Sequence, residues 1–305
     1  MIRPRRLRDL TLASPPGPGR PRHLSAASGL AVAGGRLYVI ADDELHLGRF
    51  EAGGDRPGEL LRLFEGNLPD AKKPRKARKP DLEVLTRLPP FAACPMGALL
   101  ALGSGSRRRR RRGALLRLDA SENIAGAPLP LDLSGLYDHL ARCIPGPNVE
   151  GGCVTGGELV LLQRGNKGDR LNALIRLPLP ALLHGVVGGV LEPRAAAITL
   201  IAVELGSVDG VPLSFTDCAA LPDGRIVFTA AAEDTADSYH DGGCAGSAVG
   251  MLDREGRVLR LDPLDGPHKV EGVHAWLEGE AIRLLLVTDA DDAEVPALLL
   301  SAELA

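Results

Sequence analysis

Short apolar segments, each about the length of a β-strand, recur along the whole chain between turns rich in glycine, proline and aspartate. The segments share an order: a small or acidic residue leads into an apolar run, a glycine turn follows, and a second apolar run ends in polar residues. The five copies begin at Ser28, Asp81, Asn148, Thr216 and Lys269. Self-similarity of this kind is typical of repeat proteins in which each repeat is one supersecondary unit.

Each copy predicts strands rather than helices, because its segments are rich in β-branched and aliphatic residues and are bounded by turn residues. The first four copies each supply four candidate strands, whereas the fifth supplies only three before the chain ends. Residues 6–13 form an N-terminal strand that belongs to no copy. Residues 136–143 and 179–184 are expected to form short helical turns, and residues 70–80 are expected to form an exposed loop.

Pairing the N-terminal strand with the incomplete fifth copy accounts for both irregularities and leaves no unpaired edge in a closed ring. We therefore predict an all-β fold, a five-bladed β-propeller of four-stranded antiparallel blades. The N-terminal strand completes the C-terminal blade, and residues 1–305 form a single domain.

Composition narrows the class of protein. Hydrophobic residues make up 45% of the chain and aromatic residues only 3%, so the core must consist mainly of leucine, valine, isoleucine and alanine. The net charge of −3 gives no reason to expect nucleic acid or an anionic membrane as a partner. Residues 1–20 are basic but lack the apolar stretch of a secretory signal, and no segment has the apolar length of a bilayer span. The five cysteines lack CxxC spacing, which fits reduced thiols in a cytoplasmic protein.

The repeat predicts a cluster of polar side chains, because the first strand of each propeller blade lines the central channel. Carboxylates gathered there would repel one another, so either some are protonated or a cation lies among them. Oxygen ligands without histidine or cysteine favour Ca²⁺ ahead of Mg²⁺. Two alternatives remain: the side chains bind backbone amides where blades meet, or they act catalytically without metal. The equivalent residues, and hence the candidate metal ligands, are Ser28, Glu83, Glu150, Asp217 and Glu271.

Loops on the same face as this ring carry the candidate substrate-binding residues. Basic runs at 72–79 and 107–112 flank the second copy and would attract phosphorylated small molecules, unless both are simply solvated loops. The arginine run has no accompanying aromatic platform, which argues against nucleic-acid binding. The candidate substrate-binding residues are Arg164, Asn166, Arg170, Lys79 and Lys269.

Acidic loops beside a cationic loop fit hydrolysis assisted by a metal ion. Glu233 and His240 are the candidate acid–base pair, and Arg164 would stabilise developing negative charge. The chain contains no P-loop, HExxH motif or GxSxG motif.

The first copy resembles the first blade of calcium-activated nucleotidases, the apyrase family, through Ser28-Gly29-Leu30, Gly35-Arg36-Leu37-Tyr38 and Asp42-Asp43. The resemblance implies a five-bladed propeller with a central Ca²⁺ that hydrolyses nucleoside di- and triphosphates.

It also places Glu83, Glu150 and Glu271 where that family carries its ring ligands, the last within Lys269-Val270-Glu271-Gly272-Val273. Asp217 departs from the family pattern, which reads Ser-Glu there. The segment Asn148-Val149-Glu150-Gly151 is similar to the Glu-Gly repeats of phytase-like esterase propellers. The chain thus looks like a bacterial propeller that shares the metal-ring plan with both families.

These observations predict a divalent-metal-binding propeller that hydrolyses an anionic phosphorylated or ester small molecule at the channel mouth. The alternative is a non-catalytic scaffold or binding protein with a structural Ca²⁺ in its channel. A third reading is a lactonase or sugar-modifying propeller, because metal-centred rings also support ester chemistry.

Overall fold

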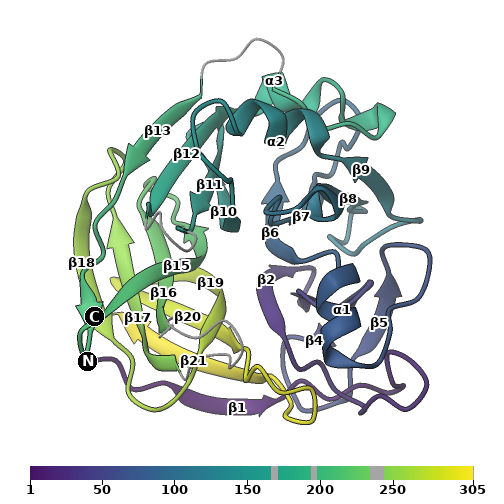
Figure 1. Cartoon of the computed structure of the whole chain (residues 1–305), viewed down its shortest axis with the longest axis horizontal. Coiled ribbons are helices and arrows are strands. Elements are labelled where there is room, and N and C mark those ends of the chain that lie inside the picture. The colour runs from purple at the N-terminus through teal and green to yellow at the C-terminus, as the bar shows by residue number, and fades with distance from the viewer. Residues whose placement is uncertain (166–170, 194–197, 234–243, 305) are drawn as a thin grey trace.

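A computed structural model describes residues 1–165, 171–193, 198–233 and 244–304. Five antiparallel sheets stand around a common axis, as Figure 1 shows. The predicted all-β, five-bladed propeller is therefore confirmed. Blade one contains β2 (Ala27–Ala33), β3 (Arg36–Ala41), β4 (His46–Glu51) and β5 (Glu59–Arg62). Blade two contains β6 (Leu82–Leu88), β7 (Ala98–Gly103), β8 (Arg112–Arg117) and β9 (Leu129–Asp132).

The remaining blades follow the same plan, with one additional short strand in blade four. Blade three contains β10 (Val149–Thr155), β11 (Glu158–Gln163), β12 (Ala173–Pro178) and β13 (Thr199–Ala202). Blade four contains β14 (Ser207–Val208), β15 (Val211–Ala220), β16 (Ile226–Glu233), β17 (Cys244–Leu252) and β18 (Val258–Pro263). Blade five contains β19 (Val270–Glu278), β20 (Ala281–Thr288), β21 (Leu298–Leu304) and, from the other end of the chain, β1 (Arg5–Asp9).

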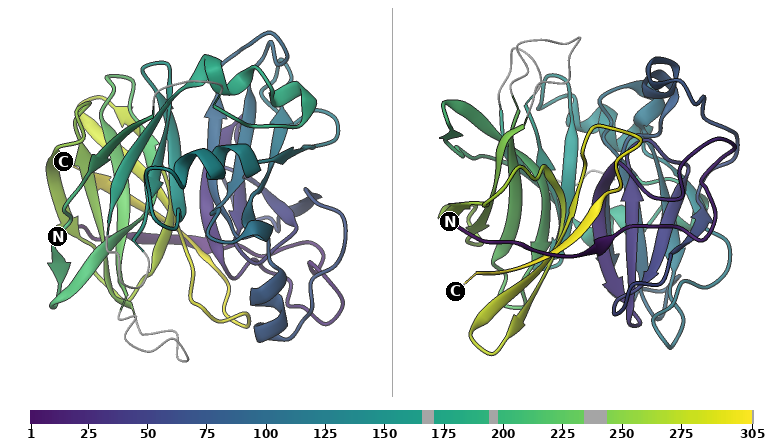
Figure 2. Two further views of the ribbon diagram at one scale, coloured as in Figure 1. Left: turned by 45° about the horizontal axis from the view of Figure 1, so that its top comes forward. Right: turned by 90° about the horizontal axis from the view of Figure 1, so that it is seen from below.

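The ring closes through the chain termini, as the strand count predicts. Strand β1 pairs with β21 in antiparallel register, with Arg5 opposite Ser301 and Asp9 opposite Leu298. Figure 2 shows purple β1 lying beside the yellow C-terminal strands. At the axis the first strands β2, β6, β10, β15 and β19 contact one another in sequence, and β19 contacts β2 again. This closed inner ring brings residues from all five blades to one channel.

The core is divided among the interfaces between blades. One cluster of buried aliphatic side chains lies between each pair of neighbouring sheets; the cluster between blades five and one, for example, joins Leu10 and Leu299 to Leu37. Burial of apolar faces on both sides of each sheet is the main force that holds the blades together. The low aromatic content therefore does not prevent a large core from forming.

Local structure differs from expectation in the basic segment before blade two. Residues predicted to form an exposed loop instead form helix α1 (Lys72–Arg78), whose Arg75 side chain is buried. Lysine, arginine and alanine are good helix formers, and Pro74 lies in the first turn, where its missing N–H is tolerated. In the part of the chain that the structure describes, the other α-helices are α2 (Ser134–Leu140) and α3 (Leu179–Leu183), close to the predicted helical turns. Among the described residues, no helix is long and apolar enough to cross a membrane.

Candidate functional site

Every inner strand carries a β-bulge at the same height in the ring. The pairing register of the first and second strands skips one residue in each blade. A bulge leaves one residue unpaired and redirects its side chain, often beside a functional site. The register also corrects the alignment of the fourth copy, where Thr216 rather than Asp217 occupies the equivalent position. The bulged residues are Ser28, Glu83, Glu150, Thr216 and Glu271.

The two hydroxyl members of this set link neighbouring blades. Ser28 Oγ donates to the carbonyl of Leu82 at 2.5 Å, and Thr216 Oγ1 donates to the carbonyl of Val270 at 2.8 Å. Each accepting carbonyl belongs to the residue just before the bulged glutamate of the next blade. The shared geometry supports the equivalence of Ser28 and Thr216, and it matches the backbone-binding alternative from the sequence.

Asp217 lies one residue beyond the bulge and is 1% exposed. Its Oδ2 atom accepts a hydrogen bond from the backbone N–H of Val273 at 2.9 Å, whereas its Oδ1 atom is buried without a partner. Burial raises the pKa of this carboxyl well above its usual range, although backbone hydrogen bonds oppose the shift. Asp217 thus connects blades four and five, and its role as a metal ligand stays a prediction.

The three bulged glutamates are nearly buried and influence one another electrostatically. Glu83, Glu150 and Glu271 are 6%, 8% and 5% exposed. Burial raises the pKa of Glu150 to about 7, with Arg164 opposing the shift and Glu271 adding to it. Burial likewise raises the pKa of Glu83 and of Glu271, and the charge of Glu150 contributes at Glu83. The channel therefore gathers more carboxyl groups than its surroundings stabilise in the ionised form.

Two cations from the predicted substrate-binding set neutralise one side of this ring. Lys269 Nζ lies 2.7 Å from Glu233 Oε1, 3.1 Å from Glu271 Oε1 and 3.1 Å from Asp291 Oδ2. Arg164 forms ion pairs with Glu150, at 3.3 Å, and with Glu233. Burial alone would raise the pKa of Glu233, but Arg164 and Lys269 outweigh it and lower the pKa to about 2. Such a carboxylate is a weak base, which does not favour the predicted acid–base role.

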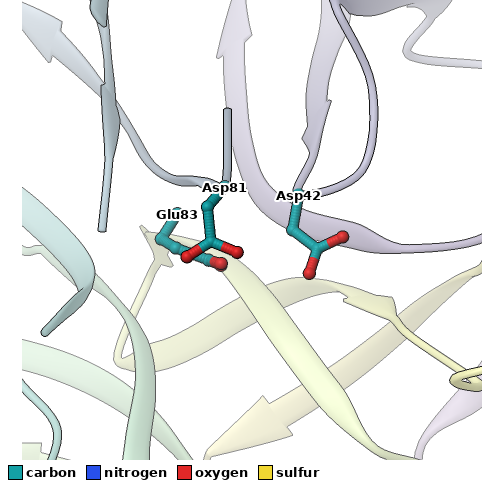
Figure 3. Close-up of side chains that lie close together, drawn as sticks. All are labelled: Asp42, Asp81 and Glu83. Atoms are coloured by element: carbon teal, nitrogen blue, oxygen red, sulfur yellow. The ribbon is translucent and has the colours of Figure 1, made fainter. Parts of the chain in front are cut away.

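A second group, where blades one and two meet, brings three carboxylates together. One oxygen each of Asp42, Asp81 and Glu83 lies within 4.8 Å of the others, and Figure 3 shows the side chains converging. Asp42 follows the end of β3, and Asp81 precedes β6. The backbone N–H of Asp81 donates to the carbonyl of Asp42 at 3.0 Å, which ties these two segments together. We call this group the acidic triad.

The sequence predicted Glu83 as a channel residue and named Asp42 only within the motif of the first copy, and Asp81 was missed as a ligand. One structural signal marks Asp81: its φ of 57° lies in the left-handed region, which non-glycine residues adopt rarely and often at functional sites. Its carbonyl accepts a hydrogen bond from the backbone N–H of Ser104 at 2.8 Å, so the left-handed conformation is held by Asp42 of blade one and Ser104 of blade two.

Cations contact two members of the acidic triad but not the third. Lys79 Nζ pairs with Asp42 and lies 3.0 Å from Asp81 Oδ1, and Arg110 lies 2.6 Å from Asp81 Oδ2. No residue in the described part of the chain donates a hydrogen bond to the Glu83 carboxylate or pairs with it at ion-pair distance. Burial raises the pKa of Asp42 to about 6, with Lys79 opposing the shift. Glu83 is thus a buried acid without a direct partner among the described residues, and the charge of nearby Lys79 only partly opposes the rise in its pKa.

A pocket of about 140 Å³ opens beside the triad between α1, the end of β3 and the loop that follows β20. Asp42 of the acidic triad and Lys79, which pairs with it, both line this pocket. Arg75 of α1 forms ion pairs with Asp43 at 2.9 Å and Glu44 at 2.5 Å, so it fixes the helix over the pocket. The basic run at 72–79 therefore contributes several positively charged side chains to the lining of this pocket.

The structure brings most predicted site residues to this mouth. Lys79, Lys269, Arg164 and Glu233 all pair with channel or rim carboxylates. Asn166, Arg170 and His240 lie outside the described residues. Whether any predicted residue binds metal or substrate stays a prediction.

Solved structures with some likeness to the chain include a luciferin-regenerating enzyme, at 9% identity and a TM-score of 0.44, covering 93% of this chain and 92% of that chain. A putative gluconolactonase matches at 12% identity and a TM-score of 0.39, covering 98% and 97%. Hydrazine synthase from Kuenenia stuttgartiensis matches at 10% identity and a TM-score of 0.38, covering 88% of this chain and 57% of that chain. At these values the likenesses carry no argument about activity.

The search of curated protein sequences found no match. A family model, described as a family of unknown function (DUF6929), matches residues 23–304. The chain therefore belongs to this family.

Proposed function

We propose that this propeller hydrolyses an anionic phosphorylated or ester small molecule at its channel mouth, with a divalent cation held by the acidic triad. The observation that carries the proposal is the Glu83 carboxylate, which is 6% exposed, has no hydrogen-bond or ion-pair partner in the described part of the chain, and lies close to Asp42 and Asp81. A buried carboxylate without a partner is costly, and a cation in the triad would offset that cost.

The donor set fits a hard cation. The triad offers oxygen atoms alone, which favours Ca²⁺ or Mg²⁺ over softer metals. Ca²⁺ takes about six to eight oxygen ligands, so three carboxylates would leave positions for water or substrate. A bound cation would supply Lewis-acid polarisation of the scissile bond.

The chain's own residues would then bind the substrate and handle protons. Arg164 and Lys269 pair with the bulged glutamates Glu150 and Glu271 and would orient an anionic group. Glu150, with a pKa of about 7, can both hold and release a proton near neutral pH. We therefore favour Glu150 over Glu233 as the acid–base group.

The test begins with protein stripped of metal and titrated with CaCl₂ or MgCl₂ by isothermal titration calorimetry. Nucleoside di- and triphosphates, simple phosphate esters and lactones would then be screened with and without the bound ion. Glu83→Gln should lose metal binding and metal-dependent turnover, whereas Glu59→Gln, on the outer strand of blade one, should retain both. Undiminished metal binding by Glu83→Gln, or no binding by the wild type, would overturn the proposed site.

One observation favours a second candidate, a non-catalytic propeller. Lys79 and Lys269 already lie among the mouth carboxylates and can hold the ring together without metal. In that case neither ion would bind, no substrate in the screen would be hydrolysed, and the mouth would serve to bind a partner.

A further inference from the structure

Lys79 occupies the part of the acidic triad that a divalent cation would need. Its Nζ atom pairs with Asp42 and lies 3.0 Å from Asp81 Oδ1, and its side chain is 11% exposed. The ammonium group therefore uses oxygen atoms that would otherwise coordinate an ion, and its charge would repel one. A divalent cation and the Lys79 ammonium cannot hold the same two carboxylates.

An entering cation therefore requires the Lys79 side chain to move. Its Nζ atom lies against Asp42 and Asp81, so the ammonium group has to leave these two carboxylates before an ion can bind them.

The structure offers a nearby place for that charge. Lys79 also lines the pocket of about 140 Å³ beside α1, together with Asp289, Asp291 and Asp292. Helix α1 itself is held by the ion pairs of Arg75, and the backbone N–H of Lys79 donates to the Arg75 carbonyl at 2.8 Å. The flexible Lys79 side chain can therefore turn into the pocket while its backbone stays in place.

We propose that Lys79 is an exchangeable internal cation: a divalent ion entering the Asp42–Asp81–Glu83 triad displaces its ammonium group into the adjoining pocket. The displacement has two consequences. Competition from Lys79 weakens metal binding, and metal loading places a free ammonium group where it can bind an anionic group of a substrate. This inference rests on the proposed cation site and adds a coupling between that site and the pocket.

Chemical labelling tests the displacement in the wild-type protein. Acetic anhydride would be applied at limiting concentration with CaCl₂ or with a chelator, and acetylation of each lysine would be measured by peptide mass spectrometry. Acetylation of Lys79 should rise several-fold with saturating Ca²⁺, because the amine leaves a buried ion pair. Lys269 has partners outside the triad, so its acetylation should stay within twofold. Unchanged labelling of Lys79 at a calorimetrically saturated site would overturn the inference.

Calorimetry of Lys79→Met tests the competition. Removing the competitor should tighten Ca²⁺ binding about tenfold or more, the scale of one charge-assisted hydrogen bond. Lys269→Met is the matched control: it removes an equally buried lysine from the same channel and should change affinity by less than about threefold, since it does not contact the triad.

The outcomes distinguish failure of the proposed cation site from failure of the Lys79 displacement. If the wild type binds neither Ca²⁺ nor Mg²⁺, the proposed cation site fails. If the wild type binds but Lys79→Met binds no more tightly, the site stands and the exchange is refuted. If Lys79→Met does not fold, as judged by circular dichroism, the labelling of the wild-type protein decides.

Discussion

Replacing Glu150 by glutamine should make the propeller more stable at alkaline pH and change little in acid. The Glu150 carboxyl is 8% exposed, and burial raises its pKa from 4.5 to about 7 despite the charge of Arg164. In the unfolded chain the same group ionises near its ordinary pKa of 4.5. As pH rises from 4.5 to 7, the unfolded state therefore releases this proton first and gains stability relative to the folded state.

The magnitude follows from the size of the shift. The pKa differs by about 2.5 between the two states, and each pKa unit corresponds to about 1.4 kcal/mol, so the ionised Glu150 costs roughly 3 kcal/mol at pH 8.5. At pH 4.5 the group is protonated in the folded protein and half protonated in the unfolded chain, so the cost falls below about 0.5 kcal/mol. Glutamine resembles the protonated acid in shape and can still accept the hydrogen bond that Asn148 Nδ2 donates to Glu150 Oε1.

The assay is urea unfolding of metal-free wild type and Glu150→Gln at pH 4.5 and pH 8.5, followed by circular dichroism. The difference between the two proteins at each pH cancels the titration of groups remote from Glu150 and leaves the effect of Glu150 together with that of Glu83, whose pKa its charge raises. The free energy of unfolding of Glu150→Gln minus that of the wild type should increase by about 3 kcal/mol from pH 4.5 to pH 8.5. A pH-independent difference, or a variant that loses stability as pH rises, would refute the assignment of a raised pKa.

Two further predictions concern the contacts between inner strands. Gly151→Ala should lower the free energy of unfolding by about 2 kcal/mol or more, because its Cβ would lie 2.5 Å from the Asp217 Cα atom of the next blade. Gly188→Ala, which meets nothing within 4 Å, is the urea-unfolding control, and equal stability of the two variants would contradict the close approach. Thr216→Val should cost about 1 kcal/mol, since it removes the donor to the Val270 carbonyl; an unchanged thermal midpoint would argue against that bond.

The fold was readable from the sequence because it depends on local, repeated signals. Strand-length apolar runs and glycine turns do not need tertiary contacts to be recognised. The fifth copy lacks one strand, and the strand at residues 6–13 belongs to no copy, so pairing the two completes the fifth blade. In the structure β1 pairs with β21, as expected. Helix α1 was not predicted because its sequence is almost entirely charged and shows no apolar face. The buried ion pairs of Arg75 with Asp43 and Glu44 stabilise it instead.

The candidate site was predicted only in part. The repeat brought Glu83, Glu150 and Glu271 to equivalent positions, but it could not show that a bulge moves the fourth position from Asp217 to Thr216. Alignment of short motifs is uncertain by one residue, and in a strand one residue reverses the face on which a side chain lies.

The sequence by itself determined the number of blades, the closure of the ring and the presence of acidic residues in its channel. Only the tertiary structure decided which charges meet there. Asp42 and Asp81 come from neighbouring blades, and Lys79 reaches both from the segment that joins those blades. Their convergence depends on how two sheets pack and on which side chains pair once water is excluded. No periodicity in the chain encodes such pairing, because the energy of an ion pair depends on distance and burial in space rather than on separation along the sequence.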